Sequence, residues 1–101
     1  MAMTTEAKKL LEAVHRRPGM FWGNSEYPFT SLIAFVMGVQ VGGGPELVPD
    51  DFHPFVAGHF GERWPSPKGW MLFIREHAAS EKEAFELFFR LREEYEQKHS
   101  A

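Results

Sequence analysis

The chain of 101 residues contains no cysteine. This absence excludes disulfide bonds, thiolate metal ligands and thiol nucleophiles, and it is compatible with a reducing compartment. Long apolar runs are also missing, since no stretch approaches the roughly 20 residues that a membrane-spanning helix needs. The polar N-terminus shows no signal-peptide pattern. We therefore expect a cytoplasmic protein with no membrane association and a single domain over residues 1–101.

Basic residues are absent from a long central interval. Residues 18–62 hold no lysine or arginine, although the net charge of the whole chain is only −3. One interpretation is that the acids of this interval serve helix ends and loops. The other is that they form a negative surface for a basic partner protein, because complementary charge speeds association. The acids are Glu26, Glu46, Asp50, Asp51 and Glu62.

Motifs for catalysis and for cofactor binding are missing as well. The glycines at 42–44 follow a predicted helix and lack the lysine and hydroxyl residues of a phosphate-binding loop. His53 and His59 are six residues apart and fall on different helix faces. His15, His77 and His99 have no second histidine or carboxylate at a useful spacing. The sequence therefore predicts no metal, no cofactor and no enzyme activity.

Clustered positive charge is too limited for nucleic-acid binding. Lys8, Lys9, Arg16 and Arg17 form a modest group in the first predicted helix and at its end. Arg16 and Arg17 would lie at the end of that helix, where positive charge is favoured by the helix dipole. Because the chain as a whole is acidic, we expect no nucleic-acid partner.

Aromatic residues are abundant, with ten phenylalanines, three tryptophans and two tyrosines to form a core. Apolar residues recur at helical spacing in five segments, which predicts an all-α fold with a single compact domain around an aromatic core. The second segment has almost no polar face, so it is expected to be central and buried. A strand over residues 70–74 is the alternative for the fourth segment. The predicted helices cover residues 5–15, 30–41, 52–60, 67–77 and 81–98.

Several residues mark the expected helix ends. Thr4 or Thr5 can cap the first helix, and Asp50 and Asp51 can cap the third. Ser66 followed by Pro67 resembles a cap with proline in the first turn. The last helix follows a capping box from Ser80 to Glu83, and Phe85 and Phe89 widen its apolar stripe so that it touches neighbours on two sides.

The stretch over residues 16–23, Arg-Arg-Pro-Gly-Met-Phe-Trp-Gly, is predicted to form a rigid corner. Pro18 disfavours a helical Arg17, so the first helix should end there. A turn at Pro18 and Gly19 would place Gly19 at positive φ. Phe21 or Trp22 should then be largely buried against the second or the last helix.

The same corner resembles the opening of gyrase B-type ATPase domains. The resemblance comprises Leu11–Val14, the Arg-Pro-Gly-Met-Phe stretch at 17–21 and Gly23. In that family the next helix carries an acidic general base and an asparagine for magnesium. The segment over residues 31–41 contains no Asp, Glu or Asn, so the resemblance implies a shared corner and not a shared ATPase function.

A longer pattern resembles small bacterial immunity proteins of polymorphic-toxin systems. That pattern has an Arg-Pro-Gly-Met-aromatic-x-Gly corner, an apolar helix, a Phe-rich segment, a Gly-Trp pair and an acidic C-terminal helix. Here it corresponds to residues 17–23, 31–38, 52–56, 69–70 and 84–91. The resemblance implies a protein without catalytic residues that binds a cognate toxin domain and blocks it sterically.

The sequence thus favours a cytoplasmic immunity protein whose partner is a toxin or another protein with a basic surface. The alternative is a small protein-binding adaptor or regulatory protein without catalytic activity, and a homodimer is compatible with either. Exposed charges steer association, and tryptophans commonly anchor interfaces. The predicted partner-binding residues are Glu46, Asp50, Asp51, Glu62, Trp22 and Trp64.

Overall fold

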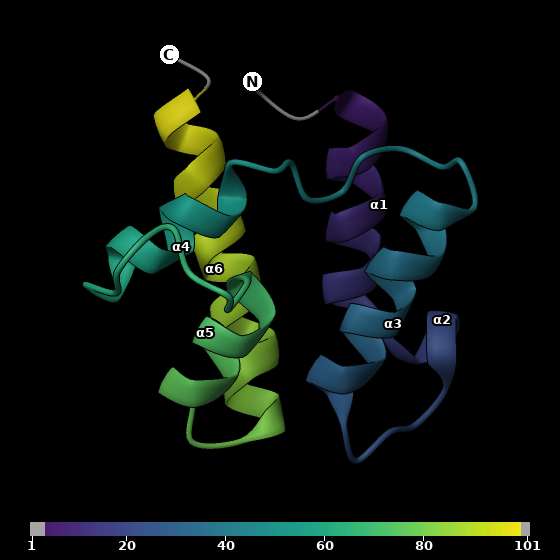
Figure 1. The fold of residues 1–101 in the computed structure, drawn as a ribbon. Helices are drawn as coiled ribbons and strands as arrows, with labels where there is room; N and C mark the ends of the chain where they lie inside the picture. Colours follow the sequence, from purple (N-terminus) through teal and green to yellow (C-terminus); the bar gives the residue numbers. More distant parts are fainter. Residues whose placement is uncertain (1–3, 100–101) are drawn as a thin grey trace.

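The computed structural model describes residues 4–99 and confirms the all-helical fold (Figure 1). Within those residues there are six helices and no strand, so the alternative strand at 70–74 is wrong. The one helix that the sequence did not predict is short and lies inside the predicted corner, over residues 19–22. The helices are α1 (Thr5–Arg16), α2 (Gly19–Trp22), α3 (Pro28–Val41), α4 (Phe52–His59), α5 (Trp70–His77) and α6 (Glu81–His99).

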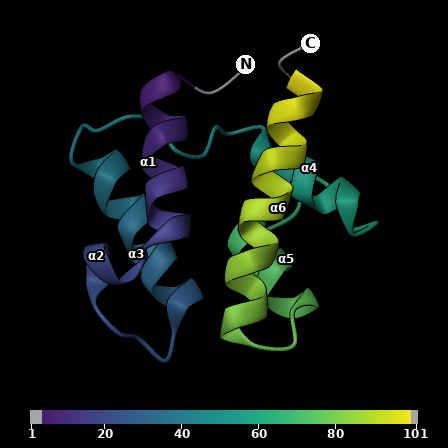
Figure 2. The same cartoon turned by 180° about the vertical axis from the view of Figure 1, so that it is seen from behind.

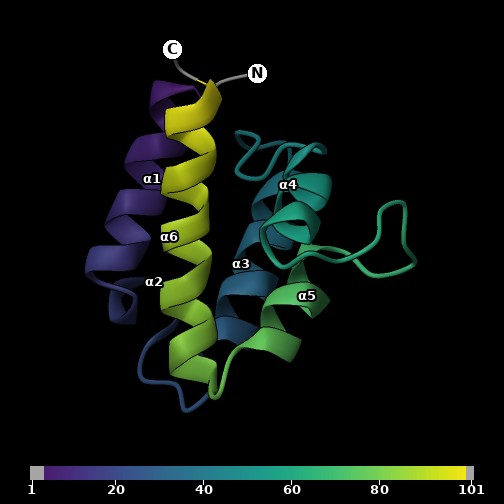
Figure 3. The same ribbon diagram turned by 90° about the vertical axis from the view of Figure 1, so that its left-hand side faces the viewer.

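The helices form two layers, with α6 at the centre of the packing. α1 and α6 lie side by side in one layer, while α3, α4 and α5 form the other (Figure 3). α6 contacts all three helices of the second layer, and α4 also packs on α5. α1 and α6 run in opposite directions, because α1 begins at the end of the molecule where α6 finishes (Figures 1 and 2).

An aromatic cluster fills the space between α4, α5 and α6. The ring of Phe52 lies 5.8 Å from that of Trp70, 5.9 Å from that of Phe88 and 5.7 Å from that of Tyr95, measured between centroids. All three contacts are edge-to-face, which is a favourable arrangement for aromatic pairs. Phe85 and Phe89 are also buried, which confirms that the apolar stripe of α6 is widened on both sides.

Two of the four predicted helix caps, at Thr4 and Ser80, are confirmed, and the two predicted for α4 and α5 are wrong. Thr4 Oγ1 accepts the Ala7 amide at 3.1 Å, and Ser80 Oγ accepts the Glu83 amide at 3.1 Å. Asp51 precedes α4 as expected, but its side chain makes no capping bond. Its carboxylate instead accepts the hydroxyl of Tyr95. Asp50 lies outside α4 and offers its main-chain carbonyl to the His53 amide.

α5 begins later than Ser66 and Pro67 suggest. Its first residue is Trp70, preceded by Gly69, and Ser66 Oγ instead accepts the Lys68 amide at 3.1 Å. The Trp70 amide is bound by Nδ1 of His53 in α4, at 3.0 Å. A Cβ atom on Gly69 would lie only 3.0 Å from the His53 ring. A tertiary contact therefore caps α5, and local sequence cannot reveal it.

α3 is buried on only one side, in contrast to the prediction of a central, buried helix. Phe29, Leu32 and Val36 are buried, whereas Met37 is 47% exposed and Val41 is 83% exposed. A helix that is apolar all round has no pattern to fix which side faces inward. The central position belongs to α6, whose 19 residues reach every helix of the second layer.

The corner between α1 and α3 forms a helical turn. α1 ends at Arg16, before a non-helical Arg17, as Pro18 predicts. Residues 19–22 then continue as α2, so the positive φ expected at Gly19 is wrong. Gly23 has that conformation instead, at φ 72°, because it ends α2. Trp22 is half-buried and packs edge-to-face on Phe35 and Phe85.

Alanine substitutions at the two corner glycines should therefore differ. Gly23 has φ 72° and ψ −164°, a region that is essentially restricted to glycine. We expect Gly23→Ala to lower the free energy of unfolding by about 1–3 kcal/mol through backbone strain. Gly19→Ala, in a helical position with open space around its Cβ, should be neutral or stabilise by about 0.5–1 kcal/mol. Urea denaturation of both variants tests this, and equal losses would contradict the assignment.

A polar junction fastens α3, α5 and α6 together. Glu81 accepts the Thr30 amide at 2.9 Å and pairs with Arg75 at 2.7 Å. Arg75 also donates to Thr30 Oγ1 and lies over the ring of Phe29. Burial acts to raise the pKa of Glu81, but the bonds from Thr30 and the charge of Arg75 outweigh it and hold that pKa below its ordinary value.

Candidate protein-binding site

The six residues predicted to bind a partner do not form one surface. Trp22 belongs to α2, whereas Glu62 and Trp64 lie in the loop over residues 60–69. α2 and that loop are on opposite sides of the molecule (Figures 1 and 2). Glu46 and Asp50 are exposed in the loop between α3 and α4.

Some of these residues are engaged within the protein. The Asp51 carboxylate binds Tyr95 and lies 3.7 Å from Nε2 of His99. Glu62 pairs with His77 at 2.9 Å. Trp64 stacks on His53 and is 42% exposed. Glu46 and Asp50 make no ion pair with any residue of 4–99, so they remain available at the surface.

Four of the five histidines pair with a carboxylate from another part of the fold. The shortest pair joins His15 of α1 to Glu86 of α6 at 2.7 Å. His59 lies 4.0 Å from Glu94, between α4 and α6. These contacts span 71 and 35 residues along the chain, which explains why spacing along the sequence showed no carboxylate near any of these histidines. They join helices, and no cluster of three potential metal ligands occurs among the residues described.

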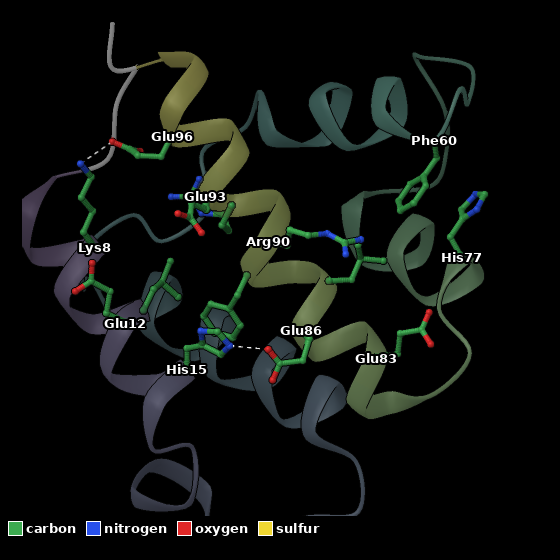
Figure 4. A pocket seen from close by; sticks show the side chains of 14 residues that line it. Lys8, Glu12, His15, Phe60, His77, Glu83, Glu86, Arg90, Glu93 and Glu96 are labelled. Carbon is green, nitrogen blue, oxygen red and sulfur yellow. Dashed lines mark hydrogen bonds and ion pairs between the residues drawn. The ribbon is translucent and has the colours of Figure 1, made fainter.

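A groove of about 830 Å³ runs along the outward side of α6 (Figure 4). α1 borders one side, while Phe60 and His77 lie on the other. Leu11, Leu87 and Phe89 contribute apolar surface. Five carboxylates line the groove, against the cations Lys8, Arg90 and Arg92. The carboxylates belong to Glu12, Glu83, Glu86, Glu93 and Glu96.

Two ion pairs bridge the groove between α1 and α6. Lys8 binds Glu96 at 2.9 Å, and His15 binds Glu86 at 2.7 Å while its ring stacks on Phe89 at 4.2 Å. The two bridges lie about two turns apart on α1 and nearly three turns apart on α6 (Figure 4). They therefore join the two antiparallel helices on either side of the space between them.

Glu12 and Glu93 lie between these bridges, on opposite walls of the groove (Figure 4). Both are exposed, and neither makes an ion pair with a described residue. Arg90 points away from them, toward Phe60 and His77 (Figure 4). Two carboxylates that face a common space and form no ion pair with a described residue favour the entry of a positive group.

Arg92 is a buried cation below this groove. Its side chain lies over the rings of Phe52 and Tyr95, with Cζ 5.5 Å and 5.2 Å from their centroids. The residue is 4% exposed, and its three guanidinium nitrogens have no hydrogen-bond partner among residues 4–99. Burial lowers the pKa of Arg92 to about 10, and the charges of Glu96 and Asp51 oppose that change.

Sequence reasoning did not identify this groove. It is lined mainly by α1 and α6, which are the first and the last long helices of the chain. The signal was present as helical spacing, since Lys8, Glu12 and His15 share one side of α1. Only the packing of α1 against α6 shows that the two charged faces meet.

None of the described helices is long and apolar enough to cross a membrane. The chain matches no protein-family model, and comparisons with curated proteins and with solved structures found no match.

Proposed function

We propose that the protein is an immunity protein that binds a basic toxin domain and blocks it sterically. The observation that carries this proposal is that Glu12 and Glu93, on opposite walls of the α6 groove, make no ion pair with a described residue. A lysine or arginine of the toxin would enter between them, and its aliphatic stem would pack on the apolar residues of the groove. The resemblance of the sequence to immunity proteins supports the same function.

The geometry suits binding better than catalysis. Glu12 and Glu93 are both exposed, so water screens their charges. A binding site requires only a partner of complementary charge. Binding would exclude water from the groove and so strengthen the attraction between the two carboxylates and the basic partner. The exposed acids Glu46 and Asp50 would add long-range attraction for the same basic partner.

Charge reversal in the groove tests the proposal. The partner is first captured with the tagged chain from cells that produce both proteins, and its toxicity is measured with and without the chain. We then expect Glu12→Lys and Glu93→Lys each to weaken binding at least about tenfold, equivalent to roughly 1.4 kcal/mol. Isothermal titration at two ionic strengths should show a smaller salt dependence for both variants.

Glu46→Lys is the matched control, because it makes the same change in net charge at an exposed site outside the groove. Its effect should be confined to a slower association rate. Binding that depends on Glu46 and is indifferent to Glu12 and Glu93 would place the interface on the loop between α3 and α4. Capture of a partner that has no toxicity would favour the adaptor or regulatory alternative.

A further inference from the structure

α3 presents an uncharged apolar face to solvent. Ala34, Met37, Gly38 and Val41 follow the i, i+3, i+4, i+7 spacing that places residues on one side of a helix. All four are exposed, and they define what we call the α3 face. No residue of α3 (Pro28–Val41) is charged. Such a surface is costly to leave in water, since burial of apolar area is the main favourable term in association.

α2 extends the α3 face sideways. The ring of Phe21 meets that of Phe35 edge-to-face at 5.3 Å, which holds α2 beside α3. Phe21 is 37% exposed and Met20 is 73% exposed. Contiguous exposed apolar patches of this kind mark interaction sites.

The middle of the α3 face allows a second helix to approach closely. Ala34 and Gly38 are small and lie one turn apart, and the position of a Cβ on Gly38 has no heavy atom within 4 Å. The longer side chains of Met37 and Val41 flank them. A groove between such ridges is what a neighbouring helix packs into.

The exposed charges near the two ends of α3 differ in net sign. Arg16 and Arg17, at the close of α1, lie at the end of the molecule where α3 begins (Figures 1 and 2), and they outnumber the one exposed acid just before α3, Glu26. Glu46 lies beyond the other end of α3. Its loop is held there by bonds from the Gly44 amide to the Val39 carbonyl at 2.8 Å and from the Val48 amide to Gln40 Oε1 at 3.1 Å. The dipole of α3 adds to this difference in charge, because its positive end is at the beginning of the helix.

From these observations we infer that the α3 face is the contact surface of a homodimer, with the two α3 helices antiparallel about a twofold axis. This arrangement sets the basic end of each copy against the acidic end of the other. A parallel pair would oppose like charges. The face carries no charge of its own that would select a foreign partner. The inference uses a different surface from the α6 groove and does not depend on the proposed function.

Sedimentation of the full chain over a range of concentrations tests the dimer. We expect the average mass to rise toward twice that of the monomer. Met37→Glu should weaken dimerisation at least about tenfold, because each dimer would bury two unpaired carboxylates. Leu72→Glu is the matched control, since Leu72 is 43% exposed, close to the 47% of Met37, but lies on α5. Circular dichroism of each variant verifies that it remains folded.

Disulfide trapping tests whether the two α3 helices are antiparallel. The chain has no native cysteine, so only the introduced cysteines can form disulfides. In an antiparallel pair centred near residue 36, Val41 of one copy lies close to Thr30 of the other. Two copies of Val41 would then be separated by about 15 Å along the axis. Mixing Thr30→Cys with Val41→Cys should therefore give mainly the mixed disulfide dimer upon oxidation.

Three results would overturn the inference. The first is a monomer at every concentration that stays soluble. The second is a dimer that Leu72→Glu disrupts as strongly as Met37→Glu. The third is rapid self-crosslinking of Val41→Cys, which indicates parallel helices. None of them bears on toxin binding in the α6 groove, which is measured with a different partner and different variants.

Discussion

Replacing Phe88 by alanine is expected to lower the free energy of unfolding by about 3–5 kcal/mol, the range for a fully buried phenylalanine. Phe88 is 0% exposed, and its ring lies 5.0 Å from that of Trp70 and 5.9 Å from that of Phe52. It thus joins α6 to both α5 and α4. Its removal leaves a cavity where three helices meet, and rigid aromatic neighbours cannot collapse to fill it.

The measurement is urea denaturation followed by circular dichroism. Domains of this size have a stability of roughly 5–15 kcal/mol, so the variant could be largely unfolded. Phe88→Leu, which retains most of the volume, gives a measurable intermediate loss. Phe21→Ala serves as the control, because Phe21 is 37% exposed and its loss should cost about 1 kcal/mol or less. A similar loss from Phe88→Ala and Phe21→Ala would mean that α6 is not packed as described.

Replacing Arg92 by methionine should leave the protein as stable or raise its free energy of unfolding by about 1–3 kcal/mol. The guanidinium is buried and has no hydrogen-bond partner among residues 4–99, and its desolvation is offset by two aromatic rings and by the charges of Glu96 and Asp51. Methionine retains much of the packing volume and carries no charge. Folding lowers the pKa of Arg92 to about 10, which likewise indicates that the charged form is disfavoured in the folded state.

Arg92→Lys provides the comparison for this experiment. It keeps the positive charge but loses the planar group that stacks on Phe52 and Tyr95, so it should be less stable than the wild type. Thermal and urea unfolding at pH 7 measure both variants. A clear destabilisation by Arg92→Met would show that the aromatic rings and acids more than compensate the buried charge, and that Arg92 supports the fold.

The carboxylate pairs of the histidines and the capping of α5 by His53 lay beyond sequence reasoning for one physical reason. Each depends on which helix faces which, and that is decided by packing between segments 15–71 residues apart. The candidate site shows the same limit. Glu46 and Asp50 are exposed and make no ion pair with a described residue, whereas Asp51 and Glu62 are engaged by Tyr95 and His77. The facing pair Glu12 and Glu93 exists only because α1 packs antiparallel to α6.

By itself, the sequence determined where the five longer helices form and where several of them begin or end. Helical apolar spacing, Pro18, Thr4 and Ser80 act within a few residues, so their effects are readable locally. It also determined that α6 would pack on two sides, because its apolar stripe is wide. Tertiary structure alone decided that α6 and not α3 lies at the centre, and which side of α3 stays exposed. Every side of an apolar helix gains by burial. Only the competition among all the helices for a shared core could therefore select which side of α3 is buried.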